Sequence, residues 1–487
     1  MATEREGGIR MECVAAIDIG TSRIKAALVD ASGVMRGMAD VRLDRAAAPG
    51  VQDAKVWVDS SAALLKRLTA EHPDIHPLAV ALTGNMHAML PVDGSGAPLL
   101  PARLWSDNSS VAESDFLNRG YAGFFREKAG NICAPVFSLP KILKFKKEYP
   151  ELYRRTARFL QSKDIVAHFL TGNFVTDASD ASGVLAMDLT TGKWDAGLLT
   201  DIGLDIKKFP DILTSSTICG RVTAQAAAAT GLATGTLVAI GAGDLATAAL
   251  GGGVDDDTLS LTLGTAGQLL GCGAPGVGKR LFGKIFVFAH ADPERELYLA
   301  SVPSGGFVFE WFARNHNLSM DEFFRRADRA RLNADYPVFM PYILGRGAPY
   351  MDYRPCGAWH KLSAEHRLDE LCLAAIFGTL AALRQGADLL TALAGVRNRL
   401  TLQALACREP AVGRTAADLF RQPRKLVPAN QEASLLGAAM LGFTAAGRFP
   451  TVGNAEREMF KYTETVQAPS PVAETLFAEY LGFAGKI

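Results

Sequence analysis

A short apolar strand that runs into Gly-Thr and then into a second strand occurs twice in this chain. The first copy covers residues 13–29 around Gly20-Thr21, and the second covers residues 258–271 around Gly264-Thr265. Each pattern predicts a β-hairpin, because glycine allows the tight turn. The copies lie about half a chain apart, which suggests a duplicated fold. Chance alone also produces such a pair.

The chain has 487 residues, which is long for one hydrophobic core and predicts two domains. Strands and helices alternate in the pattern, which indicates a layered α/β fold. Strands are expected at 34–43, 78–82 and 237–240, and helices at 56–68, 245–250, 368–393 and 433–442, the last capped by residues 430–432. No flexible linker is evident, so the pattern places the domains at 12–243 and 244–487.

The charge and cysteine content exclude several classes of protein. Lys+Arg and Asp+Glu each total 51, so no basic face for nucleic acid or an anionic membrane is predicted. The 7 cysteines form no CxxC pair or zinc spacing, which is typical of reduced thiols in a cytoplasmic protein. The first eleven residues lack the apolar core of a signal peptide. No run of about 18 apolar residues predicts a transmembrane helix.

The first hairpin carries groups suited to phosphate binding. Gly20 lets the backbone approach a ligand, and the hydroxyls of Thr21 and Ser22 can contact phosphate oxygens. Lys25 adds a positive charge, and Asp18 could hold Mg²⁺ through water. The alternative is a plain hairpin, although such a turn rarely needs an aspartate, hydroxyls and a cation together.

Gly264 and Thr265 form the matching turn in the second half and are a weaker candidate for the same task. Asp244 follows a Gly-Ala-Gly strand end and opens a helix. It suits the role of a general base that takes a proton from a sugar hydroxyl. An aspartate at this place can equally cap the helix, and both roles can hold at once.

Met86-His87 and Trp105-Ser106-Asp107 supply candidates for a sugar site. An aromatic face beside hydrogen-bonding side chains is typical of carbohydrate pockets. A histidine after a strand end is nevertheless more often structural, and Trp105 could belong to the core.

Taken in order, the motifs resemble those of the FGGY carbohydrate kinases over residues 13 to 445. The motifs are Asp18-Ile-Gly-Thr-Ser-x-x-Lys25, Gly84-Asn-Met-His87, Leu104-Trp-Ser-Asp107, Lys163-Asp164, Ser179-Asp-Ala-Ser-Gly183, Gly241-Ala-Gly-Asp244, Leu263-Gly-Thr265 and Gly437-Ala-Ala439. Within the family the chain is most similar to the xylulokinase group, which shares the Met86-His87 pair.

The resemblance implies two ribonuclease-H-like domains of the actin-like ATPase type, with a cleft between them. It implies an ATP- and Mg²⁺-dependent kinase that phosphorylates a small keto-sugar, D-xylulose first, in the cytoplasm, and it is compatible with a homodimer. Asp244 then matches the catalytic base, Asp18 the metal residue, and Met86, His87, Trp105 and Asp107 the sugar site. Gly20, Thr21, Ser22, Lys25, Gly264, Thr265 and Gly306 match nucleotide-binding positions.

Three departures from the family pattern keep alternatives open. Leu245 stands where xylulokinases have asparagine, and the resulting Gly-Asp-Leu sequence also resembles sedoheptulokinases. Ser109 stands where the family has an arginine. The glycine-rich adenosine loop corresponds to Ala404-Leu405-Ala406, which predicts nucleotide binding weaker by roughly tenfold. The rival interpretations are a kinase for sedoheptulose or another ketose or polyol, a catalytically weak sugar-binding regulator on the same scaffold, and an actin-like ATPase.

Overall fold

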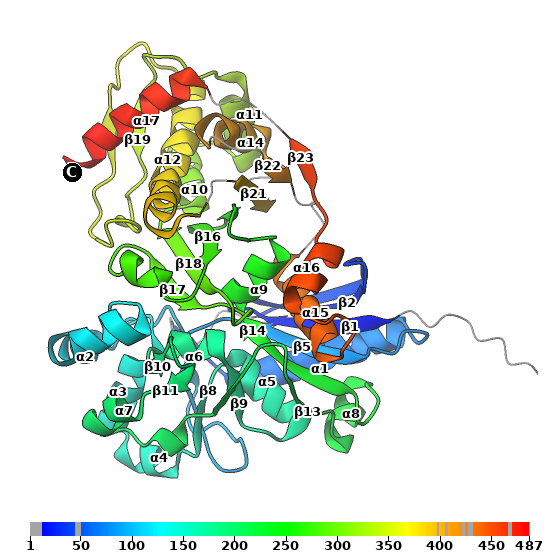
Figure 1. Cartoon of the computed structure of the whole chain (residues 1–487). Coiled ribbons are helices and arrows are strands. Elements are labelled where there is room, and N and C mark those ends of the chain that lie inside the picture. Colours follow the sequence, from blue (N-terminus) through cyan, green and yellow to red (C-terminus); the bar gives the residue numbers. More distant parts are fainter. Residues whose placement is uncertain are drawn as a thin grey trace, which may run out of the picture. The chain divides into compact units, whose positions relative to one another are not determined.

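Two compact units make up the computed structural model, which describes residues 12–43, 50–396, 399–404, 408–420, 424–426, 432–465 and 470–486 (Figure 1). Unit 1 comprises Met1–Gly251, Phe288–Arg295 and Glu432–Phe460, and unit 2 comprises Gly252–Val287, Glu296–Gln431 and Lys461–Ile487. The boundary expected after residue 243 falls at the junction of β14 (Leu237–Gly243) and α9 (Asp244–Gly251), and both elements belong to unit 1. The second half of the chain also contributes two segments to unit 1.

Unit 1 contains a six-stranded sheet in the order β13-β14-β5-β1-β2-β3. The further strands are β1 (Cys13–Ile19), β2 (Arg23–Asp30), β3 (Met35–Arg42), β5 (Ala79–Gly84) and β13 (Ile218–Arg221). The predicted succession of three strands over residues 13–43 is confirmed, with antiparallel pairing of β1 with β2 and of β2 with β3. Strand β5 is parallel to both β1 and β14. The carboxyl ends of β1, β5 and β14 therefore meet at one edge of the sheet.

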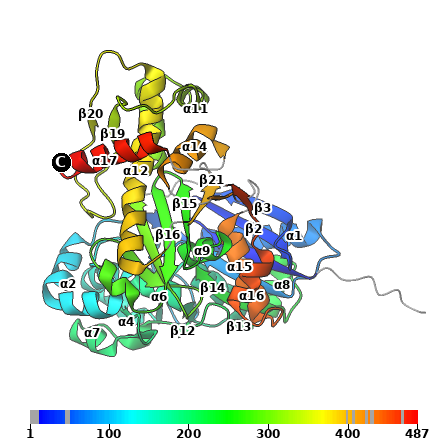
Figure 2. The same ribbon diagram turned by 45° about the horizontal axis from the view of Figure 1, so that its top comes forward.

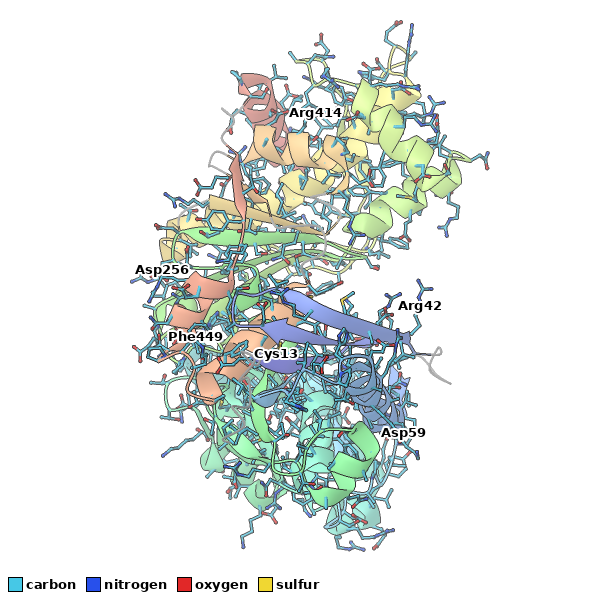
Figure 3. The ribbon with its side chains drawn as sticks, turned by 90° about the vertical axis from the view of Figure 1, so that its right-hand side faces the viewer. Cys13, Arg42, Asp59, Asp256, Arg414 and Phe449 are labelled. Carbon is cyan, nitrogen blue, oxygen red and sulfur yellow. The ribbon has the colours of Figure 1, made fainter. Side chains whose placement is uncertain are left out.

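Helices cover both faces of this sheet. Helices α1 (Ala54–Glu71) and α5 (Ser162–Thr171) cover one face, where Ala15 and Ile17 join a buried core with Trp57. The neighbouring positions Val14 and Ala81 meet α15 (Ala433–Ala445) on the other face. Strand β1 begins at Cys13, which is fully buried (Figure 3). Since alternate residues of a strand point to opposite faces, Asp18 lies on the α15 face.

Small residues allow α15 and α9 to pack closely (Figure 1). A side chain at Gly437 would collide with the Thr247 carbonyl, and one at Gly251 would collide with the Ala433 carbonyl. The predicted small-residue helix after residue 432 is thus confirmed, and its Gly437, together with Gly251 of α9, sets the distance between the two helices.

Unit 2 repeats the topology of the first sheet. Its seven strands follow the order β17-β18-β16-β15-β21-β22-β23. Strand β15 is antiparallel to β16 and parallel to β21, as β1 is to β2 and β5. Strands β18, β22 and β23 correspond in pairing to β3, β14 and β13. Their bounds are β15 (Thr258–Leu263), β16 (Gly267–Gly273), β17 (Phe286–Ala289), β18 (Glu296–Val302), β21 (Arg399–Ala404), β22 (Arg424–Leu426) and β23 (Thr463–Thr465).

Helix α12 (Leu368–Ala394), seen in Figure 2, is the long core helix of unit 2 and packs against β16 and β18. Among the described residues, it is the one helix whose length and apolar composition would allow it to cross a membrane, which the sequence analysis did not expect. In the structure 89% of that apolar window is buried. Its Arg384 pairs with Glu474 and stacks on Phe477 of α17 (Pro471–Ala484). The apolar surface of α12 is therefore used in packing.

The remaining elements are shorter and connect or flank the two sheets. In unit 1 they are β4 (Val51–Gln52), β6 (Leu90–Val92), β7 (Ala102–Arg103), α2 (Val111–Phe124), α3 (Ser138–Glu148), α4 (Pro150–Arg155), β8 (Arg158–Leu160), β9 (Val175–Asp177), α6 (Ala178–Val184), β10 (Met187–Asp188), β11 (Lys193–Trp194), α7 (Ala196–Asp201), β12 (Asp211–Leu213), α8 (Ala224–Thr230) and α16 (Val452–Met459). In unit 2 they are α10 (Gly306–Asn315), α11 (Met320–Arg329), β19 (Val338–Met340), β20 (Ala358–His360) and α14 (Pro410–Leu419), on which Arg414 pairs with Asp328 (Figure 3).

Candidate active site

The carboxyl edge of the unit 1 sheet brings together the residues that the motifs singled out. Asp18 lies near the end of β1, Met86 and His87 follow β5, and Asp244 follows β14. Asn85 fixes this edge, since its backbone and side-chain N–H groups both donate to the Ile19 carbonyl at 2.9 Å. The parallel strands thus place residues from three separate motifs side by side.

The first predicted hairpin forms at Gly20. Its N–H donates to the Arg23 carbonyl at 3.1 Å, and a Cβ on Gly20 would lie 2.6 Å from that same oxygen. Asp18 and Lys25 are directly opposed across β1 and β2. The turn therefore holds a carboxylate and a cation on one face of the sheet, next to the Thr21 and Ser22 hydroxyls.

Lys25 has a partner that the sequence did not reveal. Its Nζ lies 2.7 Å from Oε2 of Glu432, 407 positions along the chain. Glu432 is the N-cap residue of α15 but makes no side-chain capping bond. The sequence analysis assigned residues 430–432 to a helix cap, of which 430 and 431 lie outside the described residues. A glutamate at a helix start is so common that no sequence signal distinguished it.

Asp18 and Asp244 are both harder to ionise than ordinary carboxyl groups. Burial, with an added contribution from Glu432, raises the pKa of Asp18 to about 6, against the opposing effect of Lys25. Burial and then the charge of Asp18 raise the pKa of Asp244 to about 7. A carboxylate with a pKa near neutrality is a suitable proton acceptor at physiological pH.

Asp244 opens α9 immediately after β14 ends, as the sequence predicted. Its Oδ1 accepts the N–H of Leu245 at 2.8 Å, which partly satisfies the helix start. Both predicted uses of Asp244, at the helix start and as a base, are compatible with this geometry.

His87 is held in one orientation and one protonation state. Its Nδ1–H donates to the Gly183 carbonyl at 3.0 Å, and burial lowers the pKa of the ring to about 4. The neutral ring leaves Nε2 as a hydrogen-bond acceptor. Phe137 and Phe288 contact its sides, with ring centroids 5.2 Å and 5.5 Å away. Met86 is buried beside it and packs against Gly243.

Lys141 supports His87 and was missed by the sequence reasoning. His87 has a left-handed backbone, with φ of 66°. The buried Nζ of Lys141 donates to the His87 carbonyl at 3.0 Å and to the Val136 carbonyl at 2.6 Å. Burial lowers the pKa of Lys141 to about 7. A lysine on an amphipathic helix gives no sign in sequence that it points inward.

Trp105 and Asp107 differ in availability. The indole N–H of Trp105 donates to Thr21 Oγ1 at 3.1 Å, and the residue is 48% exposed, so its ring can face a ligand beside the hairpin. Asp107 is buried, accepts the Ser109 N–H at 3.0 Å and lies 3.7 Å from Arg103. These bonds favour a structural role for Asp107 in its loop.

The second predicted hairpin, in unit 2, is uncharged. Its Gly264 and Thr265 carbonyls accept N–H bonds from Gly306 at 2.7 Å and from Phe307 at 3.1 Å, so the start of α10 packs directly on the turn. A Cβ on Gly306 would lie 2.5 Å from the Gly264 oxygen. Thr265 is exposed at the tip.

The structure describes only part of the predicted nucleotide and metal sites. Leu405 and Ala406 of the expected adenosine loop lie outside the described residues, as does the side chain of Ala404. Over the described ranges no three His, Cys, Asp or Glu side chains form a metal-binding group. Asp18 and Asp244 provide two interacting carboxyls, a set that suits Mg²⁺ when phosphates and water complete its ligands.

Comparisons with known proteins identify the family to which this chain belongs. Two family descriptions match the chain: "FGGY family of carbohydrate kinases, N-terminal domain" over residues 13–251, and the C-terminal domain of the same family over residues 296–446. A xylulose kinase of Lactococcus lactis is 26% identical over 95% of this chain and 93% of its own length. A xylulose kinase of Escherichia coli is 28% identical over 88% and 89%.

Two further matches bear on fold and substrate. A crystal structure of a "xyloylose kinase" from Brucella ovis superposes with a TM-score of 0.89 at 26% identity, covering 97% of this chain and 99% of that one. The predicted fold, two domains of the actin-like ATPase type, is thereby confirmed. A gluconokinase of Bacillus licheniformis is also 26% identical, over 89% and 87% of the two chains.

Proposed function

Because this chain belongs to the FGGY family of carbohydrate kinases, which use ATP as phosphate donor, we propose that it phosphorylates D-xylulose or a closely similar keto-sugar. The chain is a carbohydrate kinase by family, and the identity of the sugar is the proposed part. Relatives named for xylulose and for gluconate match it at nearly equal identity. D-Xylulose is the first candidate because the Met86-His87 pair resembles that of the xylulokinase group. In addition, two of the relatives are named as xylulose kinases.

The observation that carries the proposal is Asp244 at the carboxyl edge, with its pKa raised to about 7. Its carboxylate takes the proton of the attacking sugar hydroxyl. The hydroxyl oxygen forms a bond to the γ-phosphorus of ATP, and the bond between that phosphorus and the β,γ-bridging oxygen breaks to release ADP. A partly buried carboxylate without a cation partner is a stronger base than a fully exposed one.

The sugar is proposed to lie beside His87 and Trp105. The unprotonated Nε2 of His87 accepts a bond from a sugar hydroxyl, and the exposed face of Trp105 packs on the carbon skeleton. Met86 supplies an apolar contact next to Gly243. Leu245 follows Asp244 and is half-buried, and its aliphatic side chain cannot form a hydrogen bond with the sugar.

Each Gly-Thr turn is proposed to offer phosphate-binding groups. Thr21, Ser22 and Lys25 provide them in unit 1, and Gly264, Thr265 and Gly306 provide them in unit 2. Asp18 would hold Mg²⁺, which when bound neutralises charge on the phosphate oxygens. Lys25 is already balanced by Glu432, so its net attraction for phosphate is smaller than that of a free lysine.

The second candidate function is a sugar-binding regulator on the same scaffold. The absence of glycines from the adenosine loop favours it. The intact pair of Asp18 and Asp244, with both pKa values moved toward neutrality, favours catalysis instead. A regulator has no need for a desolvated base, so we place the kinase first.

ADP release tests the proposal. The protein with ATP and Mg²⁺ is supplied with D-xylulose, sedoheptulose, D-gluconate, glycerol or no sugar. We expect D-xylulose to give the highest kcat/KM, and the sugar-free rate to be a small fraction of it. A higher kcat/KM for another member of the panel would correct the substrate. No stimulation by any member, together with measurable sugar binding, would support the regulator.

A further inference from the structure

The end of β14 next to Asp244 extends past β13, although it stays paired with β5 on its other side. Strand β13 pairs only with the first part of β14, from Leu237 to Ala239. Beyond that point the N–H groups of Ile240 and Gly241 donate to the carbonyls of Thr217 and Ser215, each at 3.1 Å. The last N–H, that of Gly243, has no backbone acceptor there and donates to Ser179 Oγ at 2.9 Å.

The Ser179 hydroxyl is fixed by Asp177. It donates to Asp177 Oδ2 at 2.6 Å, so its lone pair is left to accept the Gly243 N–H. Asp177 also accepts the Ser179 N–H at 2.9 Å as N-cap of α6. Ser215 Oγ donates to the same Oδ2 at 2.8 Å. Both serines and the aspartate are at most 1% exposed, so water does not compete for these bonds.

A buried charge cluster anchors Asp177 in turn. Lys163 Nζ lies 2.9 Å from Asp164 and 3.0 Å from both Asp177 and Asp180, with all four side chains at most 1% exposed. Burial raises the pKa of Asp180 well above its usual range, against the effect of Lys163. A Cβ on Gly243 would lie 3.0 Å from Asp180 Oδ1 and 2.6 Å from Met86 Cγ. The residue before Asp244 is therefore confined on two sides.

We propose that Ser179 is a positioning residue for the reaction, because its hydroxyl holds the Gly243 peptide and so sets where the Asp244 carboxylate stands. The inference rests on the proposed role of Asp244 as the base. Displacement of a catalytic group by about 1 Å can cost about 10²-fold in rate. Without the hydroxyl, the Gly243 N–H is left unsatisfied in a buried place, and the hydrogen bond that joins the strand end to α6 is lost.

Steady-state kinetics of three variants of the full-length protein test whether Ser179 positions Asp244. Ser179→Ala removes the hydroxyl, and we expect kcat to fall about 10- to 100-fold with the sugar KM within about threefold of wild type. Ser215→Ala is the matched control, since it removes an equally buried hydroxyl from the same Asp177 oxygen but touches Gly243 nowhere. It should keep kcat within about threefold while losing a similar amount of thermal stability.

The third variant separates this inference from the proposed function. In the Asp244→Asn background the further change Ser179→Ala should lower kcat by less than about threefold, because the group it positions is already disabled. A full extra loss in that background would overturn the positioning role. So would equal losses for Ser179→Ala and Ser215→Ala, or a wild-type kcat for Ser179→Ala. An active Asp244→Asn would instead remove the base itself.

If Ser179→Ala does not fold, Ser179→Cys keeps the volume and replaces the hydroxyl with a weak hydrogen-bonding group. We then expect kcat to fall by about tenfold with the sugar KM unchanged. A folded Ser179→Cys protein with wild-type kcat would contradict the inference.

Discussion

The two Gly-Thr hairpins share one topology but differ in charge. In unit 1 the turn lies among Asp18, Lys25 and Glu432, and the Asp18 charge reaches Asp244. In unit 2 the position two residues before the turn glycine is Thr262, and Gln268 stands opposite it. Over the described residues, the hydrogen bonds at that turn join backbone groups, and the N–H groups of Gly306 and Phe307 donate to the Gly264 and Thr265 carbonyls.

This difference suggests that the two hairpins have different roles. A turn built on backbone bonds and one exposed threonine can hold phosphates but has no group that exchanges a proton. A turn beside two perturbed carboxyls has such a group. We therefore propose that the unit 1 hairpin and its edge carry out the chemistry in addition to contacting phosphate, whereas the unit 2 hairpin serves nucleotide binding alone.

The largest expected effect comes from Asp244→Asn. Asparagine preserves the shape and an acceptor for the Leu245 N–H but cannot take the proton, so kcat should fall by about 10²–10⁴-fold. The sugar affinity, measured by calorimetry, should change little. A kcat within about threefold of wild type would remove Asp244 from the role of base.

Asp18→Asn is expected to act next most strongly. Losing a carboxylate that orients the metal through water typically costs about 10- to 100-fold in metal affinity or activity. The Mg²⁺ concentration needed for half-maximal rate should rise, as measured by titration at saturating sugar and ATP. The same titration on Thr262→Val is the control from unit 2, and an equal shift there would erase the contrast.

Gly306→Ala sharpens the other side of the comparison. The added Cβ would approach the Gly264 oxygen to 2.5 Å, so the start of α10 must shift against the turn. We expect the KM for ATP to rise by about tenfold with kcat within about twofold. Gly482→Ala, on α17 with open space around it, is the control. A fall in kcat with an unchanged ATP KM would be the contrary result.

The smallest expected effect is the pH dependence. Asp244 must be ionised to accept a proton, and its pKa is raised to about 7, so activity is lost as the pH falls through that value. The kcat/KM for the sugar at pH 6.5 should be about fourfold lower than at pH 8. A profile that is flat between these values would show that the group does not titrate there.

Much of the local structure was predictable from sequence, because glycine turns and apolar runs determine it. Both hairpins and the helices expected at 368–393 and 433–442 follow from such patterns, whereas the strand expected at 237–240 continues to Gly243. The carboxyl edge followed from strand ends that each carry a polar motif. Its residues Asp18, His87 and Asp244 belong to sequence motifs, and the parallel pairing of β1, β5 and β14 brings them to one edge.

Long-range pairing was not predictable, since nothing near Lys25 in the sequence marks Glu432 as its partner. For the same reason, the sequence did not predict that two segments of the second half belong to unit 1, namely Phe288–Arg295 and Glu432–Phe460. The sequence motif that contains Ser179 does not indicate a role for this residue. Its hydrogen bond with the Gly243 N–H depends on where β13 ends, which the sequence does not show. Inward-facing charge, as at Lys141, also leaves no periodic signal.

The division of work between the hairpins is tested most directly by one paired measurement. Single-turnover phosphoryl transfer to the best sugar at saturating ATP is compared for Asp18→Asn and Thr265→Ala, with ATP Kd from calorimetry. We predict that Asp18→Asn slows transfer at least tenfold while its ATP Kd stays within about threefold. Thr265→Ala should weaken ATP binding by about fivefold and transfer at nearly the wild-type rate. Slow transfer by Thr265→Ala, or wild-type transfer by Asp18→Asn, would contradict the account.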